Sequence, residues 1–203
     1  MSFDDYAKNW DTEKRINRAK IIANEISKSI DIDKNSSAME FGCGTGLVSF
    51  NLYNKFKKIT LIDSSKGMIE ILNSKIDKYK INNMVAKHLD ISNQFFLDIK
   101  FDVIYSSMVL HHVYDTEEIL KMFYELLNKD GYLCIVDLDE EDGSFHKKYP
   151  EFDGHNGFNQ DKLKSTLLNT GFNNIESYTF FYDEKVIDGE RIKYSLFMMK
   201  ARK

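Results

Sequence analysis

The stretch Met39-Glu40-Phe41-Gly42-Cys43-Gly44-Thr45-Gly46-Leu47 decides the fold of this chain. In it an apolar run ends in an acid, and three glycines follow at alternate positions. Only glycine lets a backbone turn this tightly and leaves no Cβ between the amides of the turn and a ligand. The stretch therefore predicts a strand that runs into a nucleotide-binding turn. We also expect a helix from Leu47 to about Lys55, with its positive end facing the same ligand.

The spacing of the glycines separates two kinds of nucleotide site. The dinucleotide fingerprint G-x-G-x-x-G needs its third glycine where this chain has Leu47, whereas the spacing here is G-x-G-x-G. With Glu40 before the glycines, the pattern resembles the first motif of class I S-adenosylmethionine-dependent methyltransferases. Another Rossmann-like nucleotide binder, or a glycine turn without a ligand, is the alternative. The resemblance implies S-adenosylmethionine as the cofactor, bordered by Gly42, Cys43, Gly44 and Gly46, with Glu40 reaching the methionine ammonium or holding the amides of the turn.

The composition bounds the class of protein. A chain of 203 residues, 30% charged and 42% hydrophobic, fits one globular domain. No apolar run approaches the roughly 20 residues of a membrane span, and the N-terminal residues lack the features of a signal peptide, so we expect a cytoplasmic protein. The net charge of −4 argues against a nucleic-acid partner. Cys43 and Cys134 fall on the glycine turn and in an apolar run, which indicates neither a disulfide framework nor a cysteine zinc site.

Strands and helices alternate along the first two thirds of the chain. Besides the strand that ends at Phe41, strands are predicted at 58–63, 84–90, 101–106 and 132–138, and helices near 12–30, 65–76, 115–127 and 160–170. The strands are continuous apolar runs, which is typical of an α/β protein with a parallel sheet covered on both faces.

The last third of the chain changes this rhythm. Residues 175–182 and 194–199 indicate two strands joined by an Asp188-Gly189 turn, which is a terminal β-hairpin. An antiparallel last strand is what the resembled family adds to the ordinary nucleotide-binding fold. The resemblance thus implies a Rossmann-like methyltransferase fold with a mostly parallel seven-stranded sheet, helices on both faces and a C-terminal antiparallel β-hairpin. We expect one domain, 1–203, divided into an N-terminal helical lid segment (1–35), a cofactor-binding core (36–138), a candidate substrate loop (139–159) and a helix plus β-hairpin (160–203).

Residues that follow the parallel strands are the candidates for holding the cofactor, because ligands of such sheets bind beyond the carboxyl ends of the strands. Asp63 lies about 20 residues past the glycines, where the family has an acid that accepts both ribose hydroxyl protons. A carboxylate at a helix N-terminus is the alternative. Ser64 either hydrogen-bonds the ribose or caps its helix, and Met68 either lies against the adenine ring or belongs to the core.

The third and fourth strands supply the remaining cofactor candidates. The resemblance implies that Asp90 contacts the adenine amino group, that the amide of Ile91 contacts a ring nitrogen, and that Ser106 lies where the methionine part passes. The stretch 101–113, FDVIYSSMVLHHV, resembles the corresponding region of methyltransferases that act on small molecules. It lacks the prolines of the enzymes that methylate DNA amino groups, and neither cysteine follows a proline as the cytosine-methylating enzymes require.

The segment 139–159, DEEDGSFHKKYPEFDGHNGFN, has no helical or strand period and directly follows the fifth predicted strand. Connections of this length in compact domains are commonly lids or binding loops, and its aromatic residues argue against disorder. The candidates for general bases or acceptor contacts are His111, His146 and His155, and those for acceptor or lid contacts are Tyr6, Trp10, Phe145 and Phe158. Each of them also has a structural alternative, on the surface or in the core.

His146 and His155 could form a metal site with Asp137, Asp139 or Glu141, but their spacing is irregular, so no metal is expected. The sequence therefore predicts methyl transfer from S-adenosylmethionine to a small-molecule acceptor. The first alternative is a non-catalytic S-adenosylmethionine-binding regulatory module, since a glycine motif indicates binding and not turnover. The second is an NAD-type oxidoreductase, which the missing third glycine and the terminal hairpin oppose.

Overall fold

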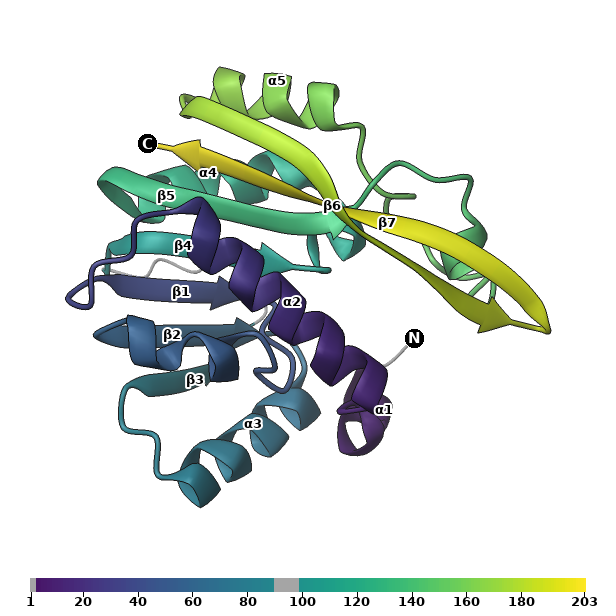
Figure 1. Cartoon of the computed structure of the whole chain (residues 1–203), viewed down its shortest axis with the longest axis horizontal. Helices are drawn as coiled ribbons and strands as arrows, with labels where there is room; N and C mark the ends of the chain where they lie inside the picture. Colours follow the sequence, from purple (N-terminus) through teal and green to yellow (C-terminus); the bar gives the residue numbers. More distant parts are fainter. Residues whose placement is uncertain (1–2, 90–98) are drawn as a thin grey trace.

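The computed structural model describes residues 3–89 and 99–203, whose strands form a seven-stranded sheet in the order β3-β2-β1-β4-β5-β7-β6 (Figure 1). The strands are β1 (Ser37–Phe41), β2 (Lys58–Asp63), β3 (Met84–His88), β4 (Phe101–Ser107), β5 (Leu127–Leu138), β6 (Asn173–Ile187) and β7 (Glu190–Arg202). Strands β1 to β5 pair in parallel, and β7 lies antiparallel between β5 and β6. This arrangement confirms the predicted fold class, including the terminal antiparallel hairpin.

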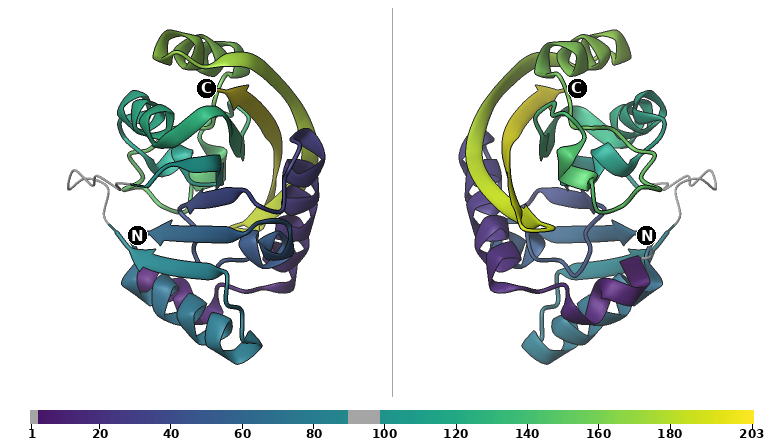
Figure 2. Two further views of the ribbon diagram at one scale, coloured as in Figure 1. Left: turned by 90° about the vertical axis from the view of Figure 1, so that its left-hand side faces the viewer. Right: turned by 90° about the vertical axis from the view of Figure 1, so that its right-hand side faces the viewer.

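Helices cover both faces of the sheet (Figure 2). Helices α2 (Glu13–Ser29) and α3 (Lys66–Tyr79) pack on one face, and α4 (Thr116–Leu126) and α5 (Gln160–Thr170) pack on the other. Because successive residues of a strand point to opposite faces, Ala38 joins the core beneath α2 and α3, whereas Met39 joins the core beneath α4 and α5. Within residues 3–89 and 99–203, no helix combines the length and apolar character needed to cross a membrane.

Polar side chains begin the longer helices, as the sequence pattern indicates. Ser65 accepts a hydrogen bond from the amide of Met68, and Asp115 accepts one from the amide of Glu118. Helix α5 ends at Gly171, whose φ of +112° is accessible to glycine at little cost.

The helix predicted from Leu47 to about Lys55 is wrong. Two short 3₁₀ turns, η2 (Ser49–Asn51) and η3 (Tyr53–Lys55), occupy this stretch. The side-chain amide of Asn51 donates to the carbonyl oxygen of Leu47 at 2.8 Å, where a continuing α-helix would use a backbone amide. Consequently residues 47–55 contain no α-helix whose dipole could point at the glycine turn.

Strands β5, β6 and β7 are all longer than predicted. Strand β5 begins at Leu127 and not at Tyr132, because Leu127 pairs with Phe101 and the backbone of 130–131 pairs with Lys203. The hairpin strands extend beyond their predicted ends because charged residues continue the ladder without an apolar period: Glu184 pairs with Lys193 and forms an ion pair with Arg191. The Asp188-Gly189 turn is confirmed, with φ values of +50° and +84° as a two-residue hairpin turn requires.

Candidate functional site

The three glycines of the turn all adopt left-handed φ values, but their surroundings differ. A Cβ on Gly42 would lie 2.4 Å from Cγ2 of Val109, and one on Gly46 would lie 2.6 Å from Cδ1 of Leu72. These two positions therefore require glycine for close packing as well as for conformation. A Cβ on Gly44 would meet only Nε1 of Trp10, at 3.6 Å. Gly44 is therefore less tightly packed than Gly42 and Gly46, and the Trp10 indole lies in van der Waals contact above it.

Asp63, at the end of β2, is held against the glycine turn. Its Oδ2 accepts a hydrogen bond of 2.7 Å from the amide of Gly44, and its Oδ1 accepts one of 2.8 Å from the amide of Ser65. Burial raises the pKa of the Asp63 carboxyl, and the two amide bonds oppose that rise. Since a carboxylate oxygen can accept more than one hydrogen bond, both oxygens keep capacity for the hydroxyls of a ribose.

Three other predicted cofactor residues point into the protein core. The Glu40 side chain is 2% exposed, and its carboxylate accepts a hydrogen bond from the hydroxyl of Ser49. The Ser106 hydroxyl donates to the carbonyl oxygen of Phe41 at 3.2 Å, across the β1–β4 pair. The Cys43 thiol is buried, and burial raises its pKa well above the usual value. Cofactor contact by Glu40, Ser106 or the Cys43 side chain remains a prediction.

The remaining cofactor candidates lie around the start of α3 and after β3. Ser65, not Ser64, caps α3, while Ser64 is exposed and its carbonyl oxygen contacts the His88 ring at 3.0 Å. Met68 is 1% exposed at the first turn of α3. The predicted adenine contacts Asp90 and Ile91 lie outside the described residues.

The N-terminal segment, comprising α1 (Phe3–Tyr6), η1 (Ala7–Asn9) and the residues up to Asp11, covers the glycine turn (Figure 1). Asp4 accepts hydrogen bonds from the Ser65 hydroxyl at 2.6 Å and the Gly67 amide at 2.7 Å. Asp11 accepts from the Thr45 hydroxyl and forms a 2.8 Å ion pair with Lys75. These bonds fix the segment across the turn.

The two aromatic candidates of this segment differ in position. Trp10 lies over the turn, in contact with the edge of the Phe3 ring at a centroid distance of 5.9 Å, and the guanidinium of Arg15 lies 3.9 Å from its ring. Tyr6 is 44% exposed and faces Tyr149 of the 139–159 segment, whose pKa is raised by burial and by the nearby Tyr6 hydroxyl. The N-terminal segment therefore contacts both the glycine turn and the predicted substrate loop.

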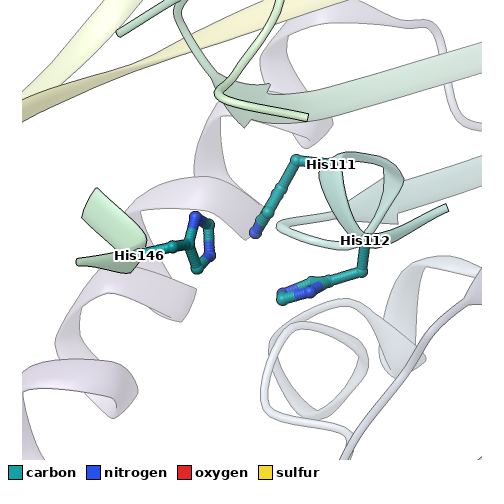
Figure 3. Close-up of side chains that lie close together, drawn as sticks. All are labelled: His111, His112 and His146. Carbon is teal, nitrogen blue, oxygen red and sulfur yellow. The ribbon is translucent and has the colours of Figure 1, made fainter. Parts of the chain in front are cut away.

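Three histidines gather beside this cover, as Figure 3 shows. His111 and His112 lie on η4 (Leu110–His112), directly after β4, and His146 lies on η5 (Ser144–His146), in the 139–159 segment. The ring centroids are 4.2 Å apart for His111 and His112 and 5.1 Å apart for His111 and His146. The Phe3 ring contacts His112 edge-on at 5.3 Å, which links the cluster to Trp10 and the turn.

The histidines of this cluster have different surroundings. His111 is 1% exposed, and its Nδ1 lies 2.5 Å from Oδ1 of the buried Asp137, at the end of β5. Burial acts to raise the pKa of Asp137, but His111 holds this pKa below its usual value. Asp137 is therefore a carboxylate that accepts a hydrogen bond from His111. Burial, together with His111 and Lys185, lowers the pKa of His146 to about 4, so the His146 ring is neutral at pH 7.

The 139–159 segment folds over the ends of β4 and β5. The backbone amide of Phe158 donates to Leu138 at 2.9 Å, and the amide of His155 donates to the carbonyl oxygen of His111 at 2.7 Å. The His155 ring is bonded to the carbonyl oxygen of Val113 at 2.9 Å and does not join the other three histidines. His146 and His155 therefore have different surroundings.

Two phenylalanines of this segment have packing roles. Phe145 is 9% exposed, and its ring centroid lies 5.0 Å from that of Tyr194 on β7. Nζ of Lys185 lies 3.3 Å from the ring centroid of Phe145. Phe158 is partly buried in the core beneath α4 and α5. A separate hollow of about 480 Å³ lies between the start of this segment and the hairpin, and none of its lining residues belongs to the glycine turn or the histidine cluster.

Sequence reasoning missed His112, Phe3 and Asp11 as residues of this region. His112 could have been identified because it directly follows His111 in the sequence. Phe3 and Asp11 flank Tyr6 and Trp10 in the segment already expected to cover the cofactor. Their place in that segment indicates the region less directly than the position of His112 does.

Comparisons with known proteins indicate the family to which this chain belongs. A family model described as a methyltransferase domain matches residues 13–177. An uncharacterised methyltransferase of Schizosaccharomyces pombe is 29% identical over 154 residues, which are 69% of this chain and 54% of that protein. A malonyl-[acyl-carrier protein] O-methyltransferase of Bacillus anthracis is 26% identical over 70% of this chain and 50% of its own length. This chain thus spans about half the length of these curated relatives.

A solved structure shares the fold. Phosphoethanolamine N-methyltransferase 2 of Haemonchus contortus, in complex with S-adenosyl-L-methionine, superposes with a TM-score of 0.74 at 15% identity, covering 100% of this chain and 60% of that one. The family model covers well over half of the sequence, and the strand order and the glycine turn agree with it. The chain belongs to the class I S-adenosylmethionine-dependent methyltransferase domain family.

Proposed function

We propose that this chain transfers the methyl group of S-adenosylmethionine to a small-molecule acceptor bound beside the glycine turn. One contact carries the proposal: Gly42 packs against Val109, and His111 follows Val109 by two residues. The turn that would hold the cofactor and the histidines that would face the acceptor are therefore neighbours. The curated relative from Bacillus anthracis, named as an O-methyltransferase that acts on a carrier-bound malonyl group, supports an oxygen nucleophile on a small group.

The residues of the turn fit the cofactor. At Gly44 the left-handed turn meets only the Trp10 indole and is not tightly packed as it is at Gly42 and Gly46, and the anchored Asp63 carboxylate suits a ribose diol. When bound, S-adenosylmethionine supplies an electrophilic methyl group on a sulfonium. Methyl transfer is an in-line displacement, so the main task of the protein is to align the acceptor atom with that methyl group.

The surrounding side chains would prepare the acceptor. Phe3 and Trp10 exclude water above the turn. The ring nitrogens of the histidine cluster can accept hydrogen bonds from an O–H, N–H or S–H group and so orient the nucleophile. The N-terminal segment and the 139–159 segment together would enclose an acceptor of metabolite size.

The proposed function is tested in two stages. First, calorimetric titration with S-adenosylhomocysteine is expected to give micromolar binding, with NADH as the control that does not bind. Second, the protein is incubated with S-adenosylmethionine and a panel of phenols, carboxylic acids, amines and thiols, and each product is analysed by mass spectrometry for a gain of one methyl group. Binding without methylation of any acceptor, together with an effect of cofactor occupancy on association with another protein, would favour the regulatory alternative.

Substitution of Gly44 by alanine is expected to weaken S-adenosylhomocysteine binding at least about tenfold, or ~1.4 kcal/mol. The added methyl group would enter the space between the turn and Trp10. Because φ is +52°, the substitution also costs about 1–2 kcal/mol of stability. Gly189→Ala is the matched control, since Gly189 has a φ of +84° with nothing within 4 Å of its Cβ position. The control should lower the melting temperature similarly and bind normally. Equal affinities for both variants would contradict the assignment.

A further inference from the structure

We propose that His111, His112 and His146 bind a divalent transition-metal ion of the zinc type through their ring nitrogens. One ring nitrogen of each residue can serve, and all three lie within 4.8 Å of one another. In a tetrahedral zinc site with Zn–N bonds of about 2.1 Å, the ligand atoms are ~3.4 Å apart. Small side-chain rotations are therefore enough to bring the three nitrogens onto one ion.

The bond between His111 and Asp137 has the form that metal-binding histidines usually show. Histidine ligands typically donate their second ring nitrogen to a carboxylate, which fixes the orientation of the ring. Here Nδ1 of His111 faces Oδ1 of Asp137 at 2.5 Å, and both side chains are 1% exposed. Asp137 is fixed in turn, because its Oδ1 also accepts from the amide of Leu138 at 2.8 Å. Nε2 of His111 is left for an ion.

His146 provides an independent observation. Its side chain is nearly buried, at 8% exposure, and its Nδ1 has no hydrogen-bond partner among residues 3–89 and 99–203. A buried polar atom without a hydrogen-bond partner is costly in a protein unless another group satisfies it. The ring is nevertheless held in one plane, stacked on Phe152 at 3.7 Å and 11°. Figure 3 shows the three rings turned toward a common space.

The chemistry of the ligands selects the class of ion. Three imidazoles and no carboxylate favour zinc or a neighbouring transition metal over magnesium or calcium, which prefer oxygen ligands. Three histidines also leave a fourth position open, as in catalytic zinc sites. His112 is exposed, so an ion can reach the site from solvent. If the proposed function holds, the open position is where an acceptor oxygen, nitrogen or sulfur would bind, but ion binding itself is independent of methyl transfer.

The test uses the full chain, produced without a polyhistidine tag and stripped with a chelator. Titration with Co²⁺ is expected to give the visible absorption of a tetrahedral site, saturating at one ion per chain, and Zn²⁺ should displace the cobalt. His112→Ala is the first variant, because His112 is exposed and its loss should not impair folding. His146→Ala is the second. Each should weaken Zn²⁺ binding at least about tenfold, and Asp137→Asn should weaken it ~10–100-fold.

His88→Gln is the matched control, since His88 is exposed on β3 and outside the cluster. It should bind Zn²⁺ like the unaltered protein, and circular dichroism spectra should match for all variants. The absence of a tetrahedral cobalt spectrum, or equal Zn²⁺ affinities for His112→Ala and the unaltered protein, would overturn the proposal. Since the readout is metal binding alone, failure of methyl transfer leaves this result unaffected, and S-adenosylhomocysteine titration of the same variants tests the proposed function separately.

Discussion

Replacing Asp63 by asparagine is expected to weaken S-adenosylhomocysteine binding about 100-fold, or ~3 kcal/mol, in calorimetric titration. The Asp63 carboxylate is fixed by the amides of Gly44 and Ser65, and under the proposed function its oxygens would accept from the ribose hydroxyls. An asparagine side chain keeps the size but turns one acceptor into a donor. That donor would face either a backbone amide or a ribose hydroxyl, so at least one charge-assisted hydrogen bond is lost.

A matched control separates this effect from a general loss of charge. Asp77 is exposed on α3, and Asp77→Asn makes the same chemical change away from the turn. It should bind S-adenosylhomocysteine normally. A second comparison isolates the ribose contact: the unaltered protein should bind adenosine more tightly than 2′,3′-dideoxyadenosine, and Asp63→Asn should lose most of that preference. If Asp63→Asn discriminates between the two nucleosides as well as the unaltered protein does, Asp63 does not hold the ribose.

The sheet and the glycine turn could be predicted because local sequence determines them. Buried parallel strands are continuous apolar runs, and the left-handed φ values of Gly42, Gly44 and Gly46 have few other solutions. The failed helix at 47–55 shows the limit of this reasoning. Its apolar spacing is compatible with a helix, but the Asn51 amide competes for the carbonyl oxygen of Leu47.

The histidine cluster could not be predicted from spacing. His111 and His112 follow a strand, whereas His146 lies in a segment without any period, and its position depends on long-range contacts. Backbone hydrogen bonds of the segment to β5, and the packing of Phe145 against Tyr194, bring His146 to the end of β4. The same contacts carry His155 to the carbonyl oxygen of Val113. His146 and His155, nine residues apart in the sequence, thus have different surroundings because of long-range contacts, which a short sequence motif does not specify.

Glu40, the acid before the glycine turn, belongs to a buried hydrogen-bond network. An oxygen of its carboxyl group accepts from the hydroxyl of Ser49, which also bonds the hydroxyl of the buried Tyr105. Burial raises the pKa of Glu40 to about 8, and the hydrogen bond from Ser49 opposes this rise. Of the nearby charges, that of Asp63 raises the pKa of Glu40 and that of Lys75 lowers it. At pH 7 the folded protein therefore retains a proton on Glu40 that the unfolded chain, with the usual pKa of 4.5, releases.

Glu40→Gln is expected to gain stability relative to the unaltered protein as the pH rises from 5 to 8. Between the unfolded pKa of 4.5 and the folded pKa of about 8, unfolding releases a proton, so the free energy of unfolding falls by up to ~1.4 kcal/mol per pH unit. The glutamine side chain has no carboxyl proton to release, so its free energy of unfolding does not fall in this way. Between pH 5 and 8 the variant should therefore gain on the order of 3–4 kcal/mol in free energy of unfolding relative to the unaltered protein. Urea unfolding of the cofactor-free protein at pH 5, 6.5 and 8 measures this change.

Glu125→Gln is the control, because Glu125 is exposed on α4, and it should follow the unaltered protein at every pH. Parallel curves for Glu40→Gln and the unaltered protein would mean that Glu40 titrates at its ordinary pKa, and that its carboxylate is available as a charge at the glycine turn.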